Sequence, residues 1–305
     1  MSKISEYSRD AFMSIAKVVT STDLHYFGYI TEVKSAINLL RSKGLEADRA
    51  TSRGTYEDML SKLTGWLATT YEALDGDLAD ISTSMSMSPF HLLTENAKVG
   101  APAWSVLPVV TCGGAGTCKS YCYSLKAWRN PAAVGRQIQN TIIARLATTC
   151  SRYRVAFMQI MEDEIKKWGR KRHARKHIRL HVDGDMWTVE YLKMWAEIVA
   201  SCPDSMVYTY TKAFEVWSEY DRLYGSITLP ENLRVRLSTD HRYGNADVVR
   251  LVEHMHTTVG YFHTYTHANA RDARVCGYMA ECEGGCKACN YKCASRIGDI
   301  WVEIH

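Results

Sequence analysis

The spacing of apolar residues changes near residue 85. Before that point, apolar side chains recur every three or four positions, which predicts helices over residues 4–19, 24–40 and 56–74. A Ser- and Met-rich stretch at 82–86 then predicts a polar linker. We therefore expect residues 1–85 to form a small helical domain.

Beyond this linker, short apolar runs alternate with helical stretches. The runs predict strands over 105–110, 177–182, 206–210, 233–237 and 261–265, and the stretches between them predict helices over 134–149, 152–168, 189–200, 214–224 and 246–256. Such alternation is typical of parallel strands joined by right-handed crossovers. The fold class we expect is α/β, with residues 86–270 forming an open sheet or a partial or complete (β/α) barrel. In such folds ligands bind at the carboxyl ends of the strands.

The composition adds that the chain is an ordinary globular protein. Of its 305 residues, 46% are hydrophobic and 23% are charged. No stretch approaches eighteen consecutive apolar residues, and the first residues lack the apolar segment of a secretory signal. These features predict a cytoplasmic protein with no membrane partner.

The positive charge is concentrated in one tract. The net charge is +4, but residues 166–177 (KKWGRKRHARKH) contain only basic charges, so the rest of the chain is mildly acidic. The basic side chains are Lys166, Lys167, Arg170, Lys171, Arg172, Arg175 and Lys176. Two interpretations remain open: a solvated helix end, or a surface that binds nucleic acid or another polyanion.

Eight of the ten cysteines lie in two clusters. The first cluster follows a predicted strand in a Gly-rich loop, at Cys112, Cys118 and Cys122. Glycines allow the backbone to turn tightly, so three thiolates can converge on one metal centre. Three ligands on an iron–sulfur cluster leave one iron available to a small molecule. Zinc with a fourth ligand from elsewhere is the alternative metal.

The second cluster defines a C-terminal metal-binding segment at 271–305. It contains Cys276, Cys282, Cys286, Cys289 and Cys293. Four of these suffice for a closed zinc or iron–sulfur site. The fifth, Cys276, is either a spare thiol or the fourth ligand of the first site, in which case no iron is left open.

Acidic and basic residues follow three predicted strands. Asp183 and Asp185 come after the strand at 177–182, Lys212 follows the next, and Ser238 and Asp240 follow the third. At strand ends, carboxylates accept hydrogen bonds from ammonium or ribose groups, and a lysine attracts phosphate or carboxylate. We predict Asp183, Asp185 and Lys212 as catalytic residues, and Asp183, Asp185, Ser238 and Asp240 as cofactor-binding residues. The alternative is that Asp185 or Thr188 caps the helix at 189–200.

Motifs across residues 87–293 resemble a family found mainly in bacteriophages and named after a mycobacteriophage product, gene product eighty-eight. The resemblance rests on residues 93–98 (LTENAK), 105–108 (SVLP), 111–112 (TC), 181–185 (HVDGD) and 210–212 (YTK), on Tyr191 and Trp195, and on the cysteines. That family looks like a divergent branch of the radical S-adenosylmethionine (SAM) enzymes. In this sequence the first cysteine spacing is C-x5-C-x3-C, whereas such enzymes use C-x3-C-x2-C.

The resemblance implies a (β/α) barrel of radical-SAM-like type, with one or two 4Fe-4S clusters, bound SAM and a reductant of the flavodoxin or ferredoxin kind. A phage-encoded enzyme of this type would work in the host cytoplasm. The basic tract favours nucleic acid or a nucleotide as substrate. The alternative function is a nucleic-acid-binding protein, such as a phage replication or regulatory factor, that an iron–sulfur or zinc site stabilises without redox turnover.

Overall fold

The computed structural model describes residues 56–95, 99–116, 118, 122, 124, 127, 130–170, 177–240, 254–265, 280–281 and 300–303. The predicted helices at 4–19 and 24–40 lie outside these residues, and so does the predicted helix at 246–256 except for its last residues, 254–256, which are not helical. The second cysteine cluster and the basic residues Lys171, Arg172, Arg175 and Lys176 also lie outside the described residues. Two compact units are present, one comprising 1–92, 105–111 and 120–160, the other 93–104, 112–119 and 161–305.

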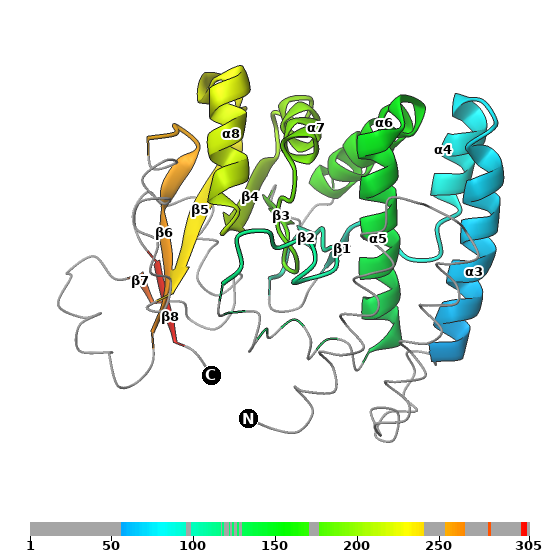
Figure 1. Cartoon of the computed structure of the whole chain (residues 1–305), viewed down its shortest axis with the longest axis horizontal. Coiled ribbons are helices and arrows are strands. Elements are labelled where there is room, and N and C mark those ends of the chain that lie inside the picture. The colour runs from blue at the N-terminus through cyan, green and yellow to red at the C-terminus, as the bar shows by residue number, and fades with distance from the viewer. Residues whose placement is uncertain are drawn as a thin grey trace. The chain divides into compact units, whose positions relative to one another are not determined.

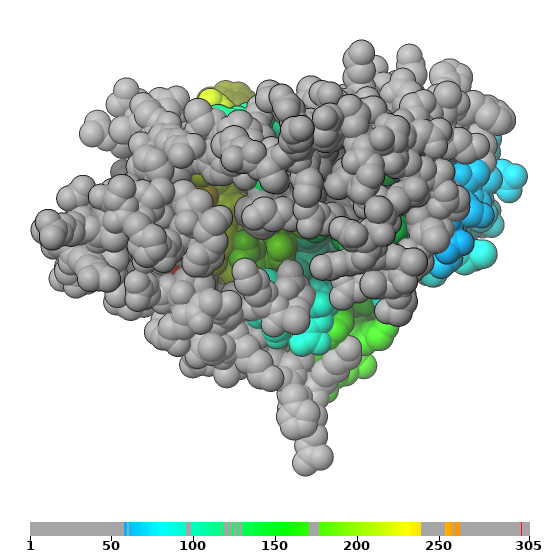
Figure 2. Space-filling model, turned by 90° about the horizontal axis from the view of Figure 1, so that it is seen from below, coloured from blue at the N-terminus to red at the C-terminus, as the bar shows by residue number. Residues whose placement is uncertain are grey.

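The first unit contains the helices α3 (Tyr56–Ala73), α4 (Leu78–Ser86) and α5 (Pro131–Thr149) (Figure 1). The surface of α3 is the blue area of Figure 2. Inside the unit, a Cβ atom placed on Gly135 of α5 would lie 2.7 Å from Met59 of α3 and 2.5 Å from the ring of Phe90. Glycine at this position therefore lets α5 approach α3 closely. Helix α6 (Ser151–Gly169) begins in this unit and ends in the other.

The predicted linker at 82–86 is wrong, because these residues belong to helix α4. Asp77 and Asp80 form a capping box at its start, and Ile81 and Met85 are fully buried. The hydroxyl groups of Ser82 and Ser86 donate to the carbonyl oxygens four residues earlier. Because the serines bond to their own helix, a stretch that resembles a flexible linker is helical.

The predicted strand at 105–110 is also wrong. Only Pro102–Ala103 (β2), just before it, joins the sheet as a strand. The backbone at 105–107 is instead bonded by side chains of α5: Asn140 donates to the Ser105 carbonyl at 3.0 Å, and the Leu107 N–H donates to Thr141 at 2.9 Å. These side chains replace a strand partner for this apolar run.

The second unit is built on an eight-stranded sheet in the order β1-β2-β3-β4-β5-β6-β8-β7. Its strands besides β2 are β1 (Thr94–Glu95), β3 (His177–Leu180), β4 (Met206–Thr211), β5 (Leu233–Asp240), β6 (Thr258–Tyr265), β7 (Ala280–Glu281) and β8 (Ile300–Glu303). All pairings are parallel except that of β1 with β2. The predicted mixed α/β class is therefore confirmed, with β1, β2, β7 and β8 as strands that the sequence did not predict.

Strands β2 to β6 are added in chain order, each next to the last. Parallel strands added in one direction with right-handed crossovers place the connecting helices on the same face. The connecting helices α7 (Val189–Ala200) and α8 (Phe214–Tyr224) do lie on one side of β3–β5 (Figure 1). Trp195, Phe214 and Trp217 from these helices are buried. The bounds of both helices are those predicted.

The opposite face of the sheet carries its own apolar cluster. It consists of Val99, Ala101, Tyr208 and Ile300, against which Val182, Met206, Tyr210 and Phe262 pack. The sheet of the second unit thus has buried apolar side chains packed on both faces.

Candidate functional site at the carboxyl ends of β3, β4 and β5

Asp185 connects the loop after β3 to the end of β4. Its side chain is 4% exposed and accepts hydrogen bonds from Thr211 Oγ1 at 2.9 Å, from the backbone N–H of Lys212 at 2.7 Å and from that of Met186 at 2.7 Å. Thr211 Oγ1 in turn accepts from the N–H of Ala213 and from Trp217 Nε1. This network fixes the turn from β4 into α8.

Burial dominates the ionisation of Asp185. Desolvation raises its pKa to about 6, although the hydrogen bonds and the charge of Lys212 act in the opposite direction. Both carboxylate oxygens accept from donors of the chain itself, so Asp185 serves here to position the strand ends. As an alternative we predicted that Asp185 or Thr188 caps α7. Thr188 is the N-cap, and its side chain accepts a hydrogen bond from the N–H of Tyr191 at 3.2 Å. That prediction is confirmed.

Lys212 joins β4 to both β5 and the first cysteine loop. Its ammonium group donates to the carbonyl oxygen of Ser238 at 3.1 Å. A Cβ atom placed on Gly114 would lie only 1.6 Å from the Lys212 carbonyl oxygen. The cysteine loop therefore packs directly on the end of β4, and only glycine fits at this contact. The structure thus brings Asp185, Lys212, Ser238 and the start of the cysteine loop to one edge.

Within the described residues, no disulfide joins Cys112, Cys118, Cys122, Cys150 or Cys202. Cys112 and Cys118 belong to the second unit and Cys122 to the first. Within the part of the chain that the structure describes, no three His, Cys, Asp or Glu residues are grouped as metal ligands.

His181 is a buried polar residue that the sequence did not single out as a site. It follows β3 with φ 53°, is 2% exposed, and has Nε2 at 3.1 Å from Tyr191 Oη, which accepts from Trp104 Nε1 at 2.9 Å. Burial, aided by the charge of Arg179, lowers the pKa of His181 to about 3, so the imidazole is neutral. A histidine held in the left-handed region directly after a strand marks a constrained turn.

The other predicted site residues, Asp183 and Asp240, lie in the loop after β3 and at the end of β5. Asp183 is partly buried in the loop between His181 and Asp185. Asp240 is the last residue of β5, and its side chain lies outside the description. Sequence reasoning missed Arg179 and Arg236, which are 8% and 0% exposed. Each arginine alternates with buried aliphatic residues in its strand, a pattern that an exposed arginine would give as well.

Comparison with known families gives one result. The family described as Gene product 88 matches residues 72–296. The chain belongs to this family. The match takes in the cysteine loop, the Asp185 loop and Lys212, and it confirms the family predicted from the motifs. No curated protein and no solved structure matches the chain.

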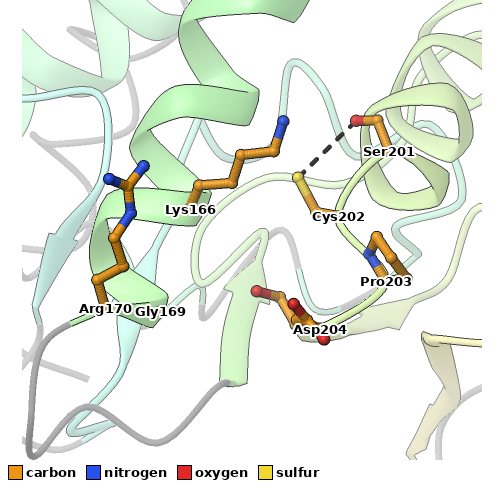
Figure 3. A pocket seen from close by; sticks show the side chains of 8 residues that line it. Lys166, Gly169, Arg170, Ser201, Cys202, Pro203 and Asp204 are labelled. Atoms are coloured by element: carbon orange, nitrogen blue, oxygen red, sulfur yellow. Dashed lines mark hydrogen bonds between the residues drawn. The ribbon is translucent and has the colours of Figure 1, made fainter.

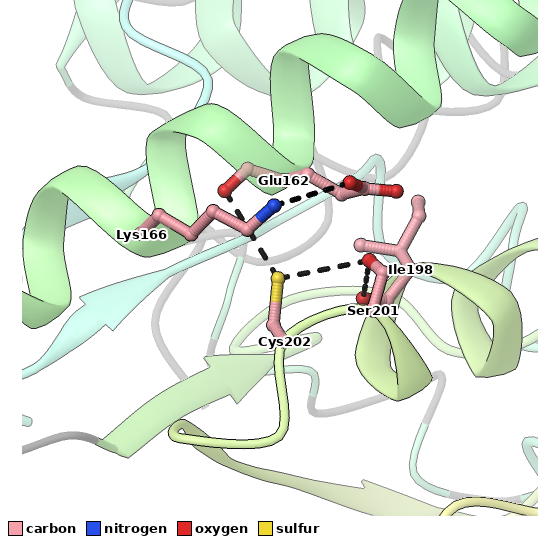
Figure 4. Close-up of polar contacts among 5 residues, drawn as sticks. All are labelled: Glu162, Lys166, Ile198, Ser201 and Cys202. Carbon is pink, nitrogen blue, oxygen red and sulfur yellow. Dashed lines mark hydrogen bonds and ion pairs between the residues drawn. The ribbon is translucent and has the colours of Figure 1, made fainter.

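In this member of the Gene product 88 family, the described basic residues of the tract at 166–177 lie at the end of α6. Lys166 pairs with Glu162 at 3.4 Å, and Lys167 pairs with Glu164 at 3.0 Å. Figure 4 shows the first pair beside Cys202. These two lysines therefore form ion pairs within their own helix, as expected for a solvated helix end.

A cavity of about 360 Å³ lies where α6 ends and before β4 begins (Figure 3). Its lining residues are Lys166, Gly169, Arg170, Ser201, Cys202, Pro203, Asp204 and Ser205. Cys202 is buried, and burial raises the pKa of its thiol. The loop is fixed by Asn232, whose amide donates to the carbonyl oxygens of Val199, Cys202 and Ser205. This cavity is at the amino end of β4, away from the strand ends that carry Asp185 and Lys212.

Among the described helices, none combines the length and apolar character that a membrane crossing requires.

Proposed function

We propose that this protein is a phage-type iron–sulfur enzyme of radical-SAM-like class, on a partial or complete (β/α) barrel, that acts on a nucleotide or nucleic acid. The observation that carries the proposal is the contact of Gly114 with the Lys212 carbonyl. It joins the cysteine loop to the edge where parallel strands present polar groups, which is where α/β enzymes bind their ligands.

The sheet topology supports the same class. Strands β2 to β6 are parallel and follow in chain order, with helices α7 and α8 on one face. This is the arrangement from which a full or partial barrel is made. The cluster itself is assigned to the cysteines by the sequence.

The chain's own residues at this edge orient and attract a ligand. Asp185 and Thr211 hold the β4 turn rigid, and this fixes the backbone on which the cysteine loop rests. The Lys212 ammonium, partly exposed and bonded to Ser238, places a positive charge at the open edge. A phosphate or carboxylate of the substrate is the group that this charge attracts.

The decisive experiment uses full-length protein purified without oxygen. We expect iron and acid-labile sulfide in the protein, and 5′-deoxyadenosine after addition of dithionite and SAM. Stoichiometric zinc with little iron or sulfide would reject the iron–sulfur assignment. Bound iron without deoxyadenosine, together with salt-sensitive nucleic-acid binding, would reject the enzyme in favour of a metal-stabilised nucleic-acid-binding protein.

The Gly114 contact provides a matched pair of variants. Gly114→Ala forces a Cβ into the Lys212 carbonyl, whereas the neighbouring Gly113 has no heavy atom within 4 Å of its Cβ position. We expect Gly114→Ala to lower both iron content and deoxyadenosine formation at least severalfold, and Gly113→Ala to retain both. Equal activity of the two variants would mean that the contact between the cysteine loop and the end of β4 is not needed for function.

The nucleic-acid-binding alternative is favoured by one observation: Arg170 and Lys166, at the start of the basic tract, face one cavity (Figure 3). Its test is replacement of Lys171, Arg172 and Arg175 by Ala, which should weaken polyanion binding and reduce the salt slope by about 0.9 per lost phosphate contact. Lys62→Ala with Arg222→Ala, two exposed cations elsewhere, is the control. An unchanged slope would leave the tract as a solvated helix end.

A further inference from the structure

The cavity at the end of α6 contains a buried hydroxyl group. Ser205 lines this cavity and is 5% exposed, and its Oγ forms no hydrogen bond with the residues that the structure describes. A Cβ atom placed on Gly169 would lie 3.9 Å from this Oγ, with no other atom within 4 Å. The hydroxyl is therefore accessible because the residue beside it has no side chain. Buried polar groups rarely lack a partner, so the partner of Ser205 comes from the cavity.

The wall that carries Ser205 is rigid before any ligand binds. The side-chain amide of Asn232 donates to the carbonyl oxygens of Val199, Cys202 and Ser205, at 3.0, 3.0 and 2.9 Å. The N–H of Ser205 also donates to the Cys202 carbonyl at 3.0 Å. Because the turn is held from inside, a ligand does not have to order it on binding.

Two cations at the end of α6 line the cavity opposite this loop (Figure 3). Arg170 is exposed, and its guanidinium forms no ion pair or hydrogen bond within the described part of the chain. The Lys166 ammonium is 3.4 Å from Glu162, and 45% of the lysine side chain remains exposed. Cations also offset the dipole at a helix C-terminus, so charge alone does not identify a site. An unpaired guanidinium beside a buried hydroxyl does, because both donate to phosphate oxygens.

Asp204 brings negative charge to the same lining. It is exposed on the loop that precedes β4, and it forms no ion pair with Arg170. The carboxylate therefore leaves the guanidinium available, while it repels an anion in the cavity through space. This opposition gives the site a charge dependence that can be measured.

The sequence around the cavity shifts the balance of charge to positive. The tract at 166–177 contains seven Lys or Arg residues and no acidic residue. Arg170 of this tract lines the cavity, and His177 at its end pairs with Met206, the residue after Ser205. Both described ends of the tract therefore adjoin the cavity, and a polyanion is the ligand that such a concentration of charge attracts.

The cavity and the strand-end site lie at opposite ends of β4. Ser205 precedes the six residues of this strand, and Lys212 follows them. At about 3.3 Å per residue, the two are about 23 Å apart along the strand. With a rise of about 3.4 Å per nucleotide, this distance corresponds to about seven nucleotides of duplex DNA. A single nucleotide is too short to contact both places, whereas a nucleic acid strand is long enough.

We propose that this cavity binds a phosphate of a nucleic acid backbone, with Arg170 as the guanidinium ligand and the Ser205 hydroxyl as a hydrogen-bond donor. Contacts of this kind position a nucleic acid without reading its sequence. The inference rests on the proposed function and narrows its substrate to a polymer, which the cavity holds while the reacting nucleotide lies at the carboxyl ends of the strands.

Binding of labelled DNA of about 20 nucleotides to the full-length protein, measured by fluorescence anisotropy, tests this inference. We expect saturable binding of the single strand or of its duplex, which AMP at the same phosphate concentration does not displace. Arg170→Gln should weaken binding at least about threefold and reduce the salt slope by about 0.7–0.9. Arg222→Gln, at an exposed arginine that pairs with Glu219 in α8, should leave both unchanged.

Two further variants test the chemistry of the lining. Asp204→Asn removes a negative charge and should tighten DNA binding severalfold, whereas a cationic ligand would be bound more weakly by this variant. Ser205→Ala removes a hydrogen bond but no charge, so it should weaken binding severalfold and keep the parental salt slope. Weaker binding by Asp204→Asn would contradict an anion in the cavity.

Gly169 provides a matched pair that leaves all charges in place. Gly169→Leu puts a side chain into the cavity, whereas Gly169→Ala adds only a Cβ atom for which there is room. We expect severalfold weaker DNA binding by Gly169→Leu and parental affinity in Gly169→Ala, with unchanged circular dichroism in both.

The inference is overturned if the parent protein binds no DNA, or if folded Arg170→Gln and Gly169→Leu bind it as the parent does. Displacement of the DNA by AMP at the same phosphate concentration would overturn the assignment of a polymer. The assay needs neither iron nor SAM, so its failure is distinct from failure to form deoxyadenosine, which bears on the proposed function alone.

Discussion

Thr211 is the residue through which the loop after β3 and the turn after β4 are connected. Its hydroxyl donates to Asp185 and accepts from both Ala213 and Trp217. The hydroxyl of Thr209, two residues earlier and equally buried, donates one long hydrogen bond of 3.4 Å to the Tyr210 carbonyl. Two buried threonines of one strand therefore differ in the number of groups that depend on them.

We predict that Thr211→Val lowers the free energy of unfolding by about 1–3 kcal/mol, because it removes the acceptor of two buried donors, Ala213 N–H and Trp217 Nε1, and one of the bonds to Asp185. Thr209→Val should cost less, since it breaks one weak bond. Urea unfolding of both variants measures the difference. Equal losses would mean that the Asp185 network contributes nothing to the fold beyond packing.

Asp185 gives the strand-end site a pH dependence of known sign. Its folded pKa is raised to about 6, above the ordinary aspartate value of 3.8, so the folded state binds the proton more tightly than the unfolded chain. The contribution of Asp185 to stability is then full below about pH 4 and decreases as the pH rises through 6. The side chain of the Asp185→Asn variant does not titrate. The free energy of unfolding of the parent protein, measured relative to that of this variant, should therefore fall by about 1–3 kcal/mol between pH 4 and pH 7.

Unfolding curves of the two proteins at pH 4.5 and pH 7 test this sign. Asp204→Asn, at an exposed carboxylate, controls for the loss of one negative charge. If the free energy of unfolding of the parent protein, relative to that of Asp185→Asn, rises with pH, burial does not dominate the ionisation of Asp185.

At the scale of elements, glycines in α3 and α5 have opposite roles. A Cβ on Gly135 would meet Phe90 and Met59 at 2.5 and 2.7 Å, whereas Gly65 of α3 has nothing within 4 Å of its Cβ position. We predict that Gly135→Ala destabilises the first unit by about 1–3 kcal/mol through overpacking. Gly65→Ala should stabilise it by up to about 1 kcal/mol through helix propensity. Thermal unfolding distinguishes the two, and stabilisation by both would show that α5 can move away from α3.

The elements also show which sequence patterns suffice. Helices α7 and α8 were predicted with the correct bounds because their apolar positions recur at helical spacing. The run at 105–110 failed as a strand because Asn140 and Thr141, distant in sequence, take its backbone groups. Arg236 was missed because a strand pattern cannot tell a buried arginine from an exposed one, and only the register places it beside Tyr210.

At the scale of the whole molecule, the two cysteine clusters lie more than 150 residues apart in the sequence, and the loop that begins the first cluster packs against Lys212 in the second unit. Metal binding at such cysteines adds directly to folding free energy, because the unfolded chain has no preformed site. The helices α3, α4 and α5 of the first unit contain no cysteine. Loss of metal should therefore destabilise some parts of the chain more than others.

We predict that anaerobic removal of iron lowers the unfolding temperature and raises amide hydrogen exchange around residues 112–116 and at the ends of β4 and β5, while α3 and α5 keep their protection. Cys118→Ser should reproduce this pattern and reduce the iron content. Cys150→Ser, at the C-cap of α5 and outside both clusters, should retain iron and the parental exchange pattern. If chelation and Cys118→Ser leave exchange at the strand ends unchanged, the first cysteine loop folds without metal, and its contact with Lys212 is purely one of packing.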